Sequence, residues 1–259
     1  IVGWEGKTVI GTVGVNKRTN RQPSLIETAR VIKDSGVENF VMYLHCQMRG
    51  EGFMGGWELD WMPKEFGVED HIAFKPGQNE DRYFGRPNKA EVDVFSLPLP
   101  ADKKEAEANL EKLGYIDILN LFDIYIDPAG AHGWGLPQCE AARCGVPIIM
   151  VDDGFARHEI FSDVVHMLAP TASEYWHTGA VLPLVSPKKM ADAIMKMIDS
   201  EDMRRVYGAA GKAKFDKYKW QPTADYFAEK VVAADKFGAE MMAKLANRKV
   251  GKDVQDVEG

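Results

Sequence analysis

The sequence predicts an α/β protein with a Rossmann-like, doubly wound parallel sheet followed by C-terminal helices. Short β-branched and apolar runs alternate along the chain with segments of helical length, which is the pattern of βαβ units. The run VPIIMV at 146–151 is apolar throughout, as expected of a strand that helices cover on both faces. Glycine and proline residues cluster directly after the run DIYID at 123–127, where a strand must turn into a helix.

The elements follow from these runs in chain order. Strands are predicted at residues 8–15, 40–46, 72–74, 92–97, 123–127 and 146–151. The first helix is predicted to begin at Ser24, because Ser24 and Glu27 have the spacing of a capping box, and to end at Gly36. Further helices are predicted at residues 101–113, 116–122 and 136–144, and the chain from Pro187 onward has an almost entirely helical pattern.

This pattern suggests three parts. We expect a Rossmann-like domain over residues 1–187, a helical segment over 188–247 and an unstructured tail over 248–259. The chain begins at Ile1 without the residue order of a signal peptide, and we interpret this start as a cut inside a longer chain.

Composition narrows the class of protein. Lys and Arg number 32 against 39 Asp and Glu, a formal net charge of −7, which argues against a protein that coats nucleic acid. No apolar run in the sequence reaches the roughly 18 residues that a membrane-spanning helix needs. The three cysteines lack CxxC spacing, which favours a reducing, cytoplasmic compartment.

The stretch DPAGAHGWGLPQCEAARCGVPII, residues 127–149, predicts a ligand site. Ligands of doubly wound sheets bind outside the carboxyl ends of the strands, and the glycines of this stretch allow the backbone to approach a ligand closely. Pro137 suits a first helical turn, whose free N–H groups attract anions, and Glu140, one turn further, can accept hydrogen bonds from sugar hydroxyls. The alternative is a plain strand-to-helix turn whose glycines serve only tight packing.

The same stretch resembles the signature of the retaining, nucleotide-sugar-dependent glycosyltransferases of family four, the group-one transferases. The matching positions are Asp123, Pro128, Gly133, Trp134, Gly135, Leu136, Pro137, Glu140, Ala141, Gly145 and Pro147. The segments 13–29, 156–160 and 218–227 also resemble family segments in the same order. The resemblance therefore covers about residues 8 to 230 of the chain.

The resemblance implies one half of a two-domain enzyme of the GT-B architecture. The chain resembles the C-terminal, donor-binding half, so the acceptor-binding N-terminal domain is expected to be a missing partner. The implied substrate is a nucleotide sugar, whose sugar is transferred with retention to an unknown acceptor, and no cofactor or metal is implied. The other half could attach such an enzyme to the periphery of a membrane.

The resemblance also assigns roles to residues. Glu140 would hold the donor ribose, and Glu159 has a family counterpart near the donor. The backbone around Gly133, Gly135, Leu136 and Gln138 would meet the diphosphate or the sugar. In the loop after the first strand, Lys17, Arg18 and Arg21 would neutralise the leaving diphosphate, although such charges are also common in a solvated loop.

One position departs from the family. Eight residues before Glu140 the family usually has another Glu, and here that position is His132. A histidine can still hydrogen-bond sugar hydroxyls or pair with phosphate, so we assign His132 and Glu140 as the catalytic candidates. The alternative for His132 is a solvent-exposed loop residue.

Two other function classes remain open. A nucleotide- or anion-binding module without transfer activity is favoured by His132 and by the missing half. A nicotinamide-dependent enzyme ranks last, because no GxGxxG follows the first predicted strand. Asp152 and Asp153 follow the last predicted strand, but adjacent residues there project to opposite faces, so no metal site is predicted.

Overall fold

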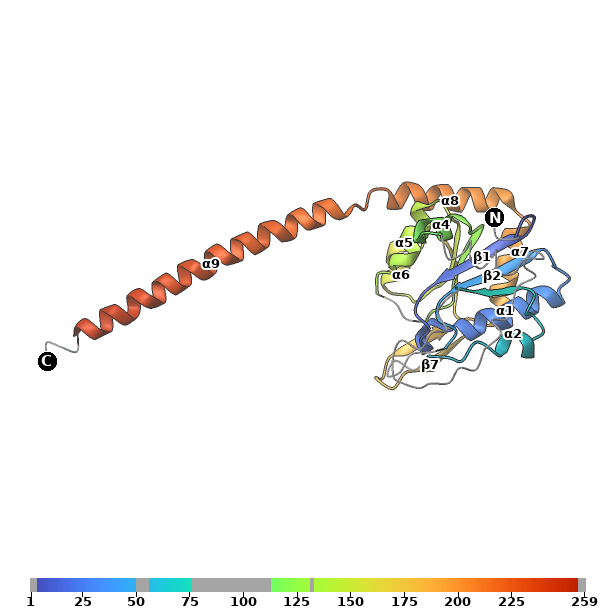
Figure 1. The fold of residues 1–259 in the computed structure, drawn as a ribbon, viewed down its shortest axis with the longest axis horizontal. Coiled ribbons are helices and arrows are strands. Elements are labelled where there is room, and N and C mark those ends of the chain that lie inside the picture. Colours follow the sequence, from blue (N-terminus) through green and yellow to red (C-terminus); the bar gives the residue numbers. More distant parts are fainter. Residues whose placement is uncertain (1–3, 50–55, 76–112, 131–132, 256–259) are drawn as a thin grey trace. The chain divides into compact units, whose positions relative to one another are not determined.

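The parallel sheet of the compact unit lies between two layers of helices (Figure 1). A computed structural model describes residues 4–49, 56–75, 113–130 and 133–255, with side chains described as far as residue 244. The chain divides into one compact unit that ends at Phe215 and a second unit from Asp216 onward.

Among the described residues six strands form the sheet, and every neighbouring pair of them is parallel. They are β1 Thr8–Val13, β2 Phe40–His45, β3 Ile72–Phe74, β4 Ile124–Asp127, β5 Ile148–Val151 and β6 His166–Leu168. The strand order β3-β2-β1-β4-β5-β6 reverses direction at β1. The sheet is therefore doubly wound, and the α/β class predicted from the sequence is confirmed.

The helices form a layer on each face of the sheet. One face is covered by α1 Gln22–Asp34, α2 Met62–Glu65 and α7 Pro187–Ile198, and the other by α4 Tyr115–Asn120, α5 Leu136–Arg143, α6 Ala156–Phe161 and α8 Glu201–Phe215 (Figure 1). A short 3-10 helix, η1 Arg18–Asn20, leads into α1.

Alternation along each strand divides the apolar side chains between two cores. On β5, Ile149 belongs to the core beneath α1 and α7, whereas Ile148 and Met150 belong to the core beneath α5 and α8. Successive strand residues point to opposite faces of a sheet. A strand buried on both faces is therefore apolar at every position, which is why VPIIMV has no polar residue.

The second core depends on a close approach between α8 and the turn after α5. A Cβ atom added at Gly208 of α8 would meet the carbonyl oxygen of Gly145, and one at Gly211 would lie 3.3 Å from the Cβ of Ala142. Only glycine allows this distance of approach at Gly208, because a backbone carbonyl cannot move away as a flexible side chain can.

Several element boundaries differ from the sequence prediction. Helix α1 begins at Gln22, with Arg21 as N-cap in the left-handed region at φ 54°, so the capping box predicted at Ser24 is wrong. Ser24 lies inside the helix, where its carbonyl accepts a hydrogen bond from the Thr28 hydroxyl at 2.6 Å. The predicted strand at 92–97 and the predicted helix at 101–113, except its last residue, lie outside the described residues.

The predicted parts of the chain also divide differently. The compact unit ends at Phe215 rather than near residue 187, because α7 packs against α1 and Phe215 of α8 is buried in the second core. In the second unit, α9 Trp220–Gln255 is a continuous helix, which extends well into the segment expected to be an unstructured tail.

Three of the described strands were not predicted from the sequence, and neither were the short helices η1, α2 and α6. The strands are β6 and the two strands of an antiparallel hairpin, β7 Ala172–Tyr175 and β8 Val181–Leu184. All four residues of β7 are exposed, so the strand lacks the apolar pattern by which buried strands are recognised.

Among the helices that the structure describes, none is both long and apolar enough to cross a membrane.

Candidate functional site

The loops at the carboxyl ends of β1 and β4 touch each other. The Gly130 N–H, in the loop after β4, donates to the Thr19 carbonyl oxygen of η1 at 3.1 Å. A Cβ atom at Gly130 would lie 2.8 Å from the Pro183 carbonyl oxygen of β8. The glycine therefore lets three segments meet: the loop after β1, the loop after β4 and the hairpin.

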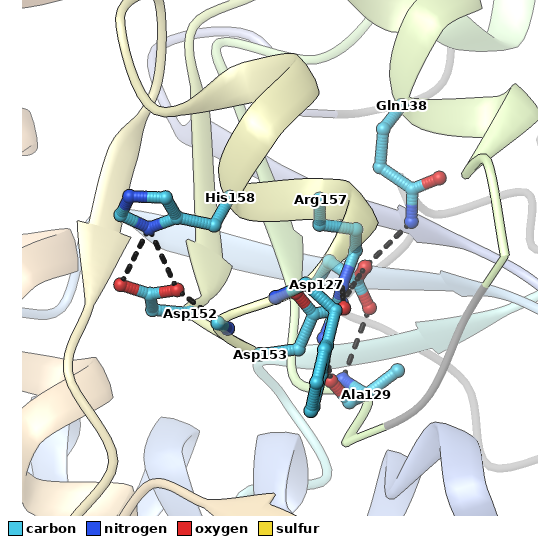
Figure 2. Close-up of polar contacts among 9 residues, drawn as sticks. Asp127, Ala129, Gln138, Asp152, Asp153, Arg157 and His158 are labelled. Atoms are coloured by element: carbon cyan, nitrogen blue, oxygen red, sulfur yellow. Dashed lines mark hydrogen bonds and ion pairs between the residues drawn. The ribbon is translucent and has the colours of Figure 1, made fainter.

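A fully buried arginine, Arg157 of α6, holds the carboxyl ends of β4 and β5 (Figure 2). Its Nη1 donates to Asp127 Oδ2 and its Nε to Asp153 Oδ2, both at 2.9 Å. Its Nη2 donates to the carbonyl oxygen of Ala129 at 2.7 Å. One guanidinium thus binds the last residue of β4, the loop after β4 and the loop after β5.

Asp127 extends this network into α5. Its Oδ2 also accepts from Gln138 Nε2 at 2.6 Å, and its Oδ1 accepts from the Ala129 N–H at 3.0 Å. Gln138 is 1% exposed, so its side chain is committed to the network. Only the backbone of Gln138 is left for the donor-binding role that the resemblance implies.

The same contacts decide the ionisation of Asp153. Burial favours the neutral acid, but the Phe155 N–H and the Arg157 guanidinium both donate to the carboxylate, and together they lower its pKa below the usual value. Asp153 therefore stays ionised beside the buried guanidinium. A buried charge needs such partners, because desolvation without them is very costly.

Sequence reasoning missed Arg157, although two signals were present. Asp127 ends an apolar strand, where a buried acid requires a cationic partner. Asp153 and Arg157 are also four residues apart at a helix start, a spacing that allows an ion pair. Neither signal indicates that one arginine serves both acids.

Glu140 lies where the sequence predicts it, one turn into α5. The helix is preceded by Gly135 at φ 76°, and Pro137 occupies its first turn. The side chain of Glu140 is half-buried, and its Oε2 accepts a hydrogen bond from the Tyr115 hydroxyl at 2.7 Å. Gly133 and Leu136 are exposed in the residues just before and at the start of α5.

The three basic residues of the first loop have different environments. Arg21 is 13% exposed, and its Nη2 pairs with Glu174 of β7 at 2.7 Å, which ties the loop to the hairpin. Lys17 is half-buried and Arg18 is exposed. Within the described part of the chain, no ion pair engages Lys17 or Arg18.

The residues after β5 point in different directions (Figure 2). His158 is exposed, and its Nδ1 lies 3.0 Å from both carboxylate oxygens of Asp152. Asp152 and Asp153 thus have separate partners, His158 and Arg157. Glu159 is exposed on α6, and His132 lies outside the described residues.

The fold is that of a Rossmann-like domain, and the carboxyl ends of its strands are the candidate ligand site. Residues 91–214 match the family model of the glycosyl transferases group 1. No curated protein matches the chain.

Solved structures share the fold, and two of the three that follow are named as glycosyltransferases. Alr3699/HepE of Anabaena, in complex with UDP-glucose, has a TM-score of 0.58 at 14% identity over 89% of this chain and 50% of its own. The C-terminal domain of LpcC, a group 1 family glycosyl transferase of Francisella tularensis, has a TM-score of 0.51 and 18% sequence identity. The match covers 83% of this chain and 87% of the LpcC chain. WaaG, a glycosyltransferase of lipopolysaccharide biosynthesis, has a TM-score of 0.52 and 13% sequence identity. The match covers 83% of this chain and 44% of the WaaG chain.

These matches confirm the resemblance stated from the sequence. Residues 91–214 match the model of the glycosyl transferases group 1, and the compact unit shares its fold with the C-terminal domain of LpcC. The chain spans about half the length of HepE and less than half that of WaaG.

Proposed function

We propose that this chain is the nucleotide-sugar-binding half of a glycosyltransferase that transfers a sugar with retention. The observation that carries the proposal is Glu140, a half-buried carboxylate on the first turns of α5, the helix that begins at the exposed Leu136. The group 1 family match supports sugar transfer. The HepE complexes with UDP and UDP-glucose support a nucleoside diphosphate sugar as the class of donor.

The described residues suggest how such a donor is held. Glu140 would accept hydrogen bonds from the ribose hydroxyls, and Glu159 would lie toward the donor from α6. The backbone N–H groups at the start of α5 have no partner within the helix, and they point at an anion placed before it. The donor diphosphate would occupy that position, near the backbone of Gly133 and Leu136.

The leaving diphosphate gains negative charge as its bond to the sugar breaks. Lys17 and Arg18 are the cations available to stabilise this charge, and the helix start adds its own positive end, so we propose a transfer without a metal ion. Arg21 is already paired with Glu174, and its main part in the site is to hold the loop. His132 would contact the sugar in place of the family's Glu, and a second domain of the kind found in the longer relatives would hold the acceptor.

A ligand panel tests the proposal. The purified chain should be stabilised against heat by one of UDP, ADP or GDP and by the matching nucleotide sugars, but not by NAD, because a ligand that binds only the folded state raises its melting temperature. Stabilisation by NAD alone would contradict the proposal. Binding of a nucleotide sugar with no transfer by the longest natural form of the protein would favour the non-catalytic binding module.

The loop after β1 provides a second test. Changing both Lys17 and Arg18 to alanine should weaken binding of the nucleoside diphosphate and flatten its dependence on salt, because exposed charges interact through a screening length of ~8–10 Å at moderate ionic strength. The matched control is the double change of Lys188 and Arg205, which are exposed on α7 and α8. Unchanged affinity and salt dependence in the loop variant would make the loop an ordinary solvated surface.

A further inference from the structure

Glu140 is held by a tyrosine from a different helix. Tyr115 is the first residue of α4, and its hydroxyl donates to Glu140 Oε2 at 2.7 Å. Among the described residues, Tyr115 is the one hydrogen-bond partner of the Glu140 side chain. A carboxylate can accept about four hydrogen bonds, so this contact leaves Oε1 and part of Oε2 available to a ligand.

Tyr115 is itself fixed from two sides. The start of α4 is held by the Asp117 carboxylate, whose Oδ2 accepts from the Gly114 N–H at 3.0 Å. The Tyr115 ring lies 6.2 Å from the ring of His45 at the end of β2, and Nδ1 of His45 lies 3.1 Å from the Tyr43 hydroxyl. The Tyr115 hydroxyl therefore meets Glu140 from a constrained position.

The protonation of these groups suits a permanent contact. Burial raises the pKa of the Tyr115 hydroxyl, and the hydrogen bond to Glu140 and its negative charge raise it further, so Tyr115 remains a donor throughout the physiological range. Burial lowers the pKa of His45 to about 4, and the charge of Lys75 acts in the same direction. At neutral pH the histidine adds no charge that would compete for the Glu140 carboxylate.

We propose that Tyr115 is a positioning residue for recognition of the donor ribose: it holds the Glu140 carboxylate in place, with the remaining lone pairs toward the ribose hydroxyls. This inference rests on the proposed function and deepens it. A free glutamate side chain loses rotamer freedom when it binds, and a carboxylate already held in place loses less. Tyr115 therefore acts through Glu140, and its contribution depends on the ribose hydroxyl that Glu140 receives.

The test compares a ribonucleotide with its deoxy counterpart. The nucleoside diphosphate that binds best among UDP, ADP and GDP is titrated calorimetrically into wild type and Tyr115→Phe, together with its 2′,3′-dideoxy form, which has no ribose hydroxyl for Glu140. The hydroxyl of Tyr115 should matter when Glu140 has a ribose hydroxyl to bind, so Tyr115→Phe is expected to weaken the ribonucleotide about fivefold and the deoxynucleotide less than about twofold. The dissociation constant of the deoxynucleotide divided by that of the ribonucleotide should therefore fall toward unity in Tyr115→Phe.

The control is Tyr207→Phe, at a ring that packs beside His166 on the far strand β6, and it should leave both affinities unchanged. Equal losses for the two nucleotides in Tyr115→Phe, or no loss for either, would overturn the positioning role and leave the proposed function standing. A wild-type chain that binds no nucleoside diphosphate would instead overturn the proposed function, and this inference with it.

Discussion

Replacing Arg157 with methionine is expected to lower the free energy of unfolding by about 3–5 kcal/mol. Methionine fills much of the same volume, but it removes all three hydrogen bonds that the guanidinium makes. Asp127 and Asp153, whose side chains are 5% and 6% exposed, would be left as buried acids without their cation. Removing one partner of a buried ion pair is costly because the remaining charge keeps its desolvation cost and loses its charged partner.

Urea denaturation followed by circular dichroism measures this loss. The matched control is Arg205→Met, an arginine of α8 that is 72% exposed and paired with Asp202, for which a change within about 0.5 kcal/mol is expected. Adding Asp127→Asn and Asp153→Asn to Arg157→Met should restore part of the stability, because neutral amides carry no uncompensated charge. A loss below about 1 kcal/mol in the single variant would show that the buried charges are not what holds the strand ends together.

The Arg157 network also predicts acid sensitivity. The pKa of Asp153 is lowered in the folded protein, so its contribution to stability is fully present above the pKa of the unfolded chain, roughly 3.9, and is lost as the pH falls through the lower folded value. Wild type should therefore lose this contribution only in strong acid. With Arg157 replaced, much of the contribution should already be absent at neutral pH.

Glu140→Ala is expected to weaken binding of a nucleoside diphosphate by about 1–3 kcal/mol, the worth of hydrogen bonds to a charged group. The change removes the carboxylate proposed to receive the ribose hydroxyls. The fold should be retained, because Glu140 is half-buried on the surface of α5 and its partner Tyr115 is 36% exposed and can bind water instead.

Calorimetric titration of the folded variant measures the loss, with Glu65→Ala on α2 as the control at an exposed glutamate. The loss should shrink when the 2′-deoxy nucleotide is used, since one of the hydroxyl groups is then absent from the ligand. A folded Glu140→Ala variant with wild-type affinity would remove Glu140 from the site, and the proposed function would lose the observation that carries it.

Local sequence patterns predicted most of the strands of this fold. The apolar runs and the spacing of apolar residues identified every strand of the sheet among the described residues except β6, and β3 has the predicted bounds. These patterns are informative because burial repeats every two residues in a strand and about every 3.6 in a helix. The strands that were not predicted, β6, β7 and β8, are short, and β7 has no buried residue. The helices that were not predicted, η1, α2 and α6, have at most six residues each.

The candidate site was likewise predicted from the sequence only in part. The position of Glu140 could be predicted because glycine and proline determine locally where β4 ends and α5 begins, and the carboxyl end of a parallel strand is a known place for ligands. The partners of the site residues could not be predicted. Tyr115 and Glu140 are 25 positions apart, Asp127 and Arg157 are 30 apart, and Arg21 and Glu174 are 153 apart.

The sequence by itself therefore determined the α/β class, the family resemblance and the helix turn that carries Glu140. Only the tertiary structure decided which charges are buried together, so that Arg157, passed over in the sequence, holds two strand ends, while Arg21, assigned to a ligand, holds the hairpin. The reason is physical. Periodicity and turn residues act on neighbouring positions, whereas the partner of a charge is set by the crossing of strands and helices that are distant in the chain.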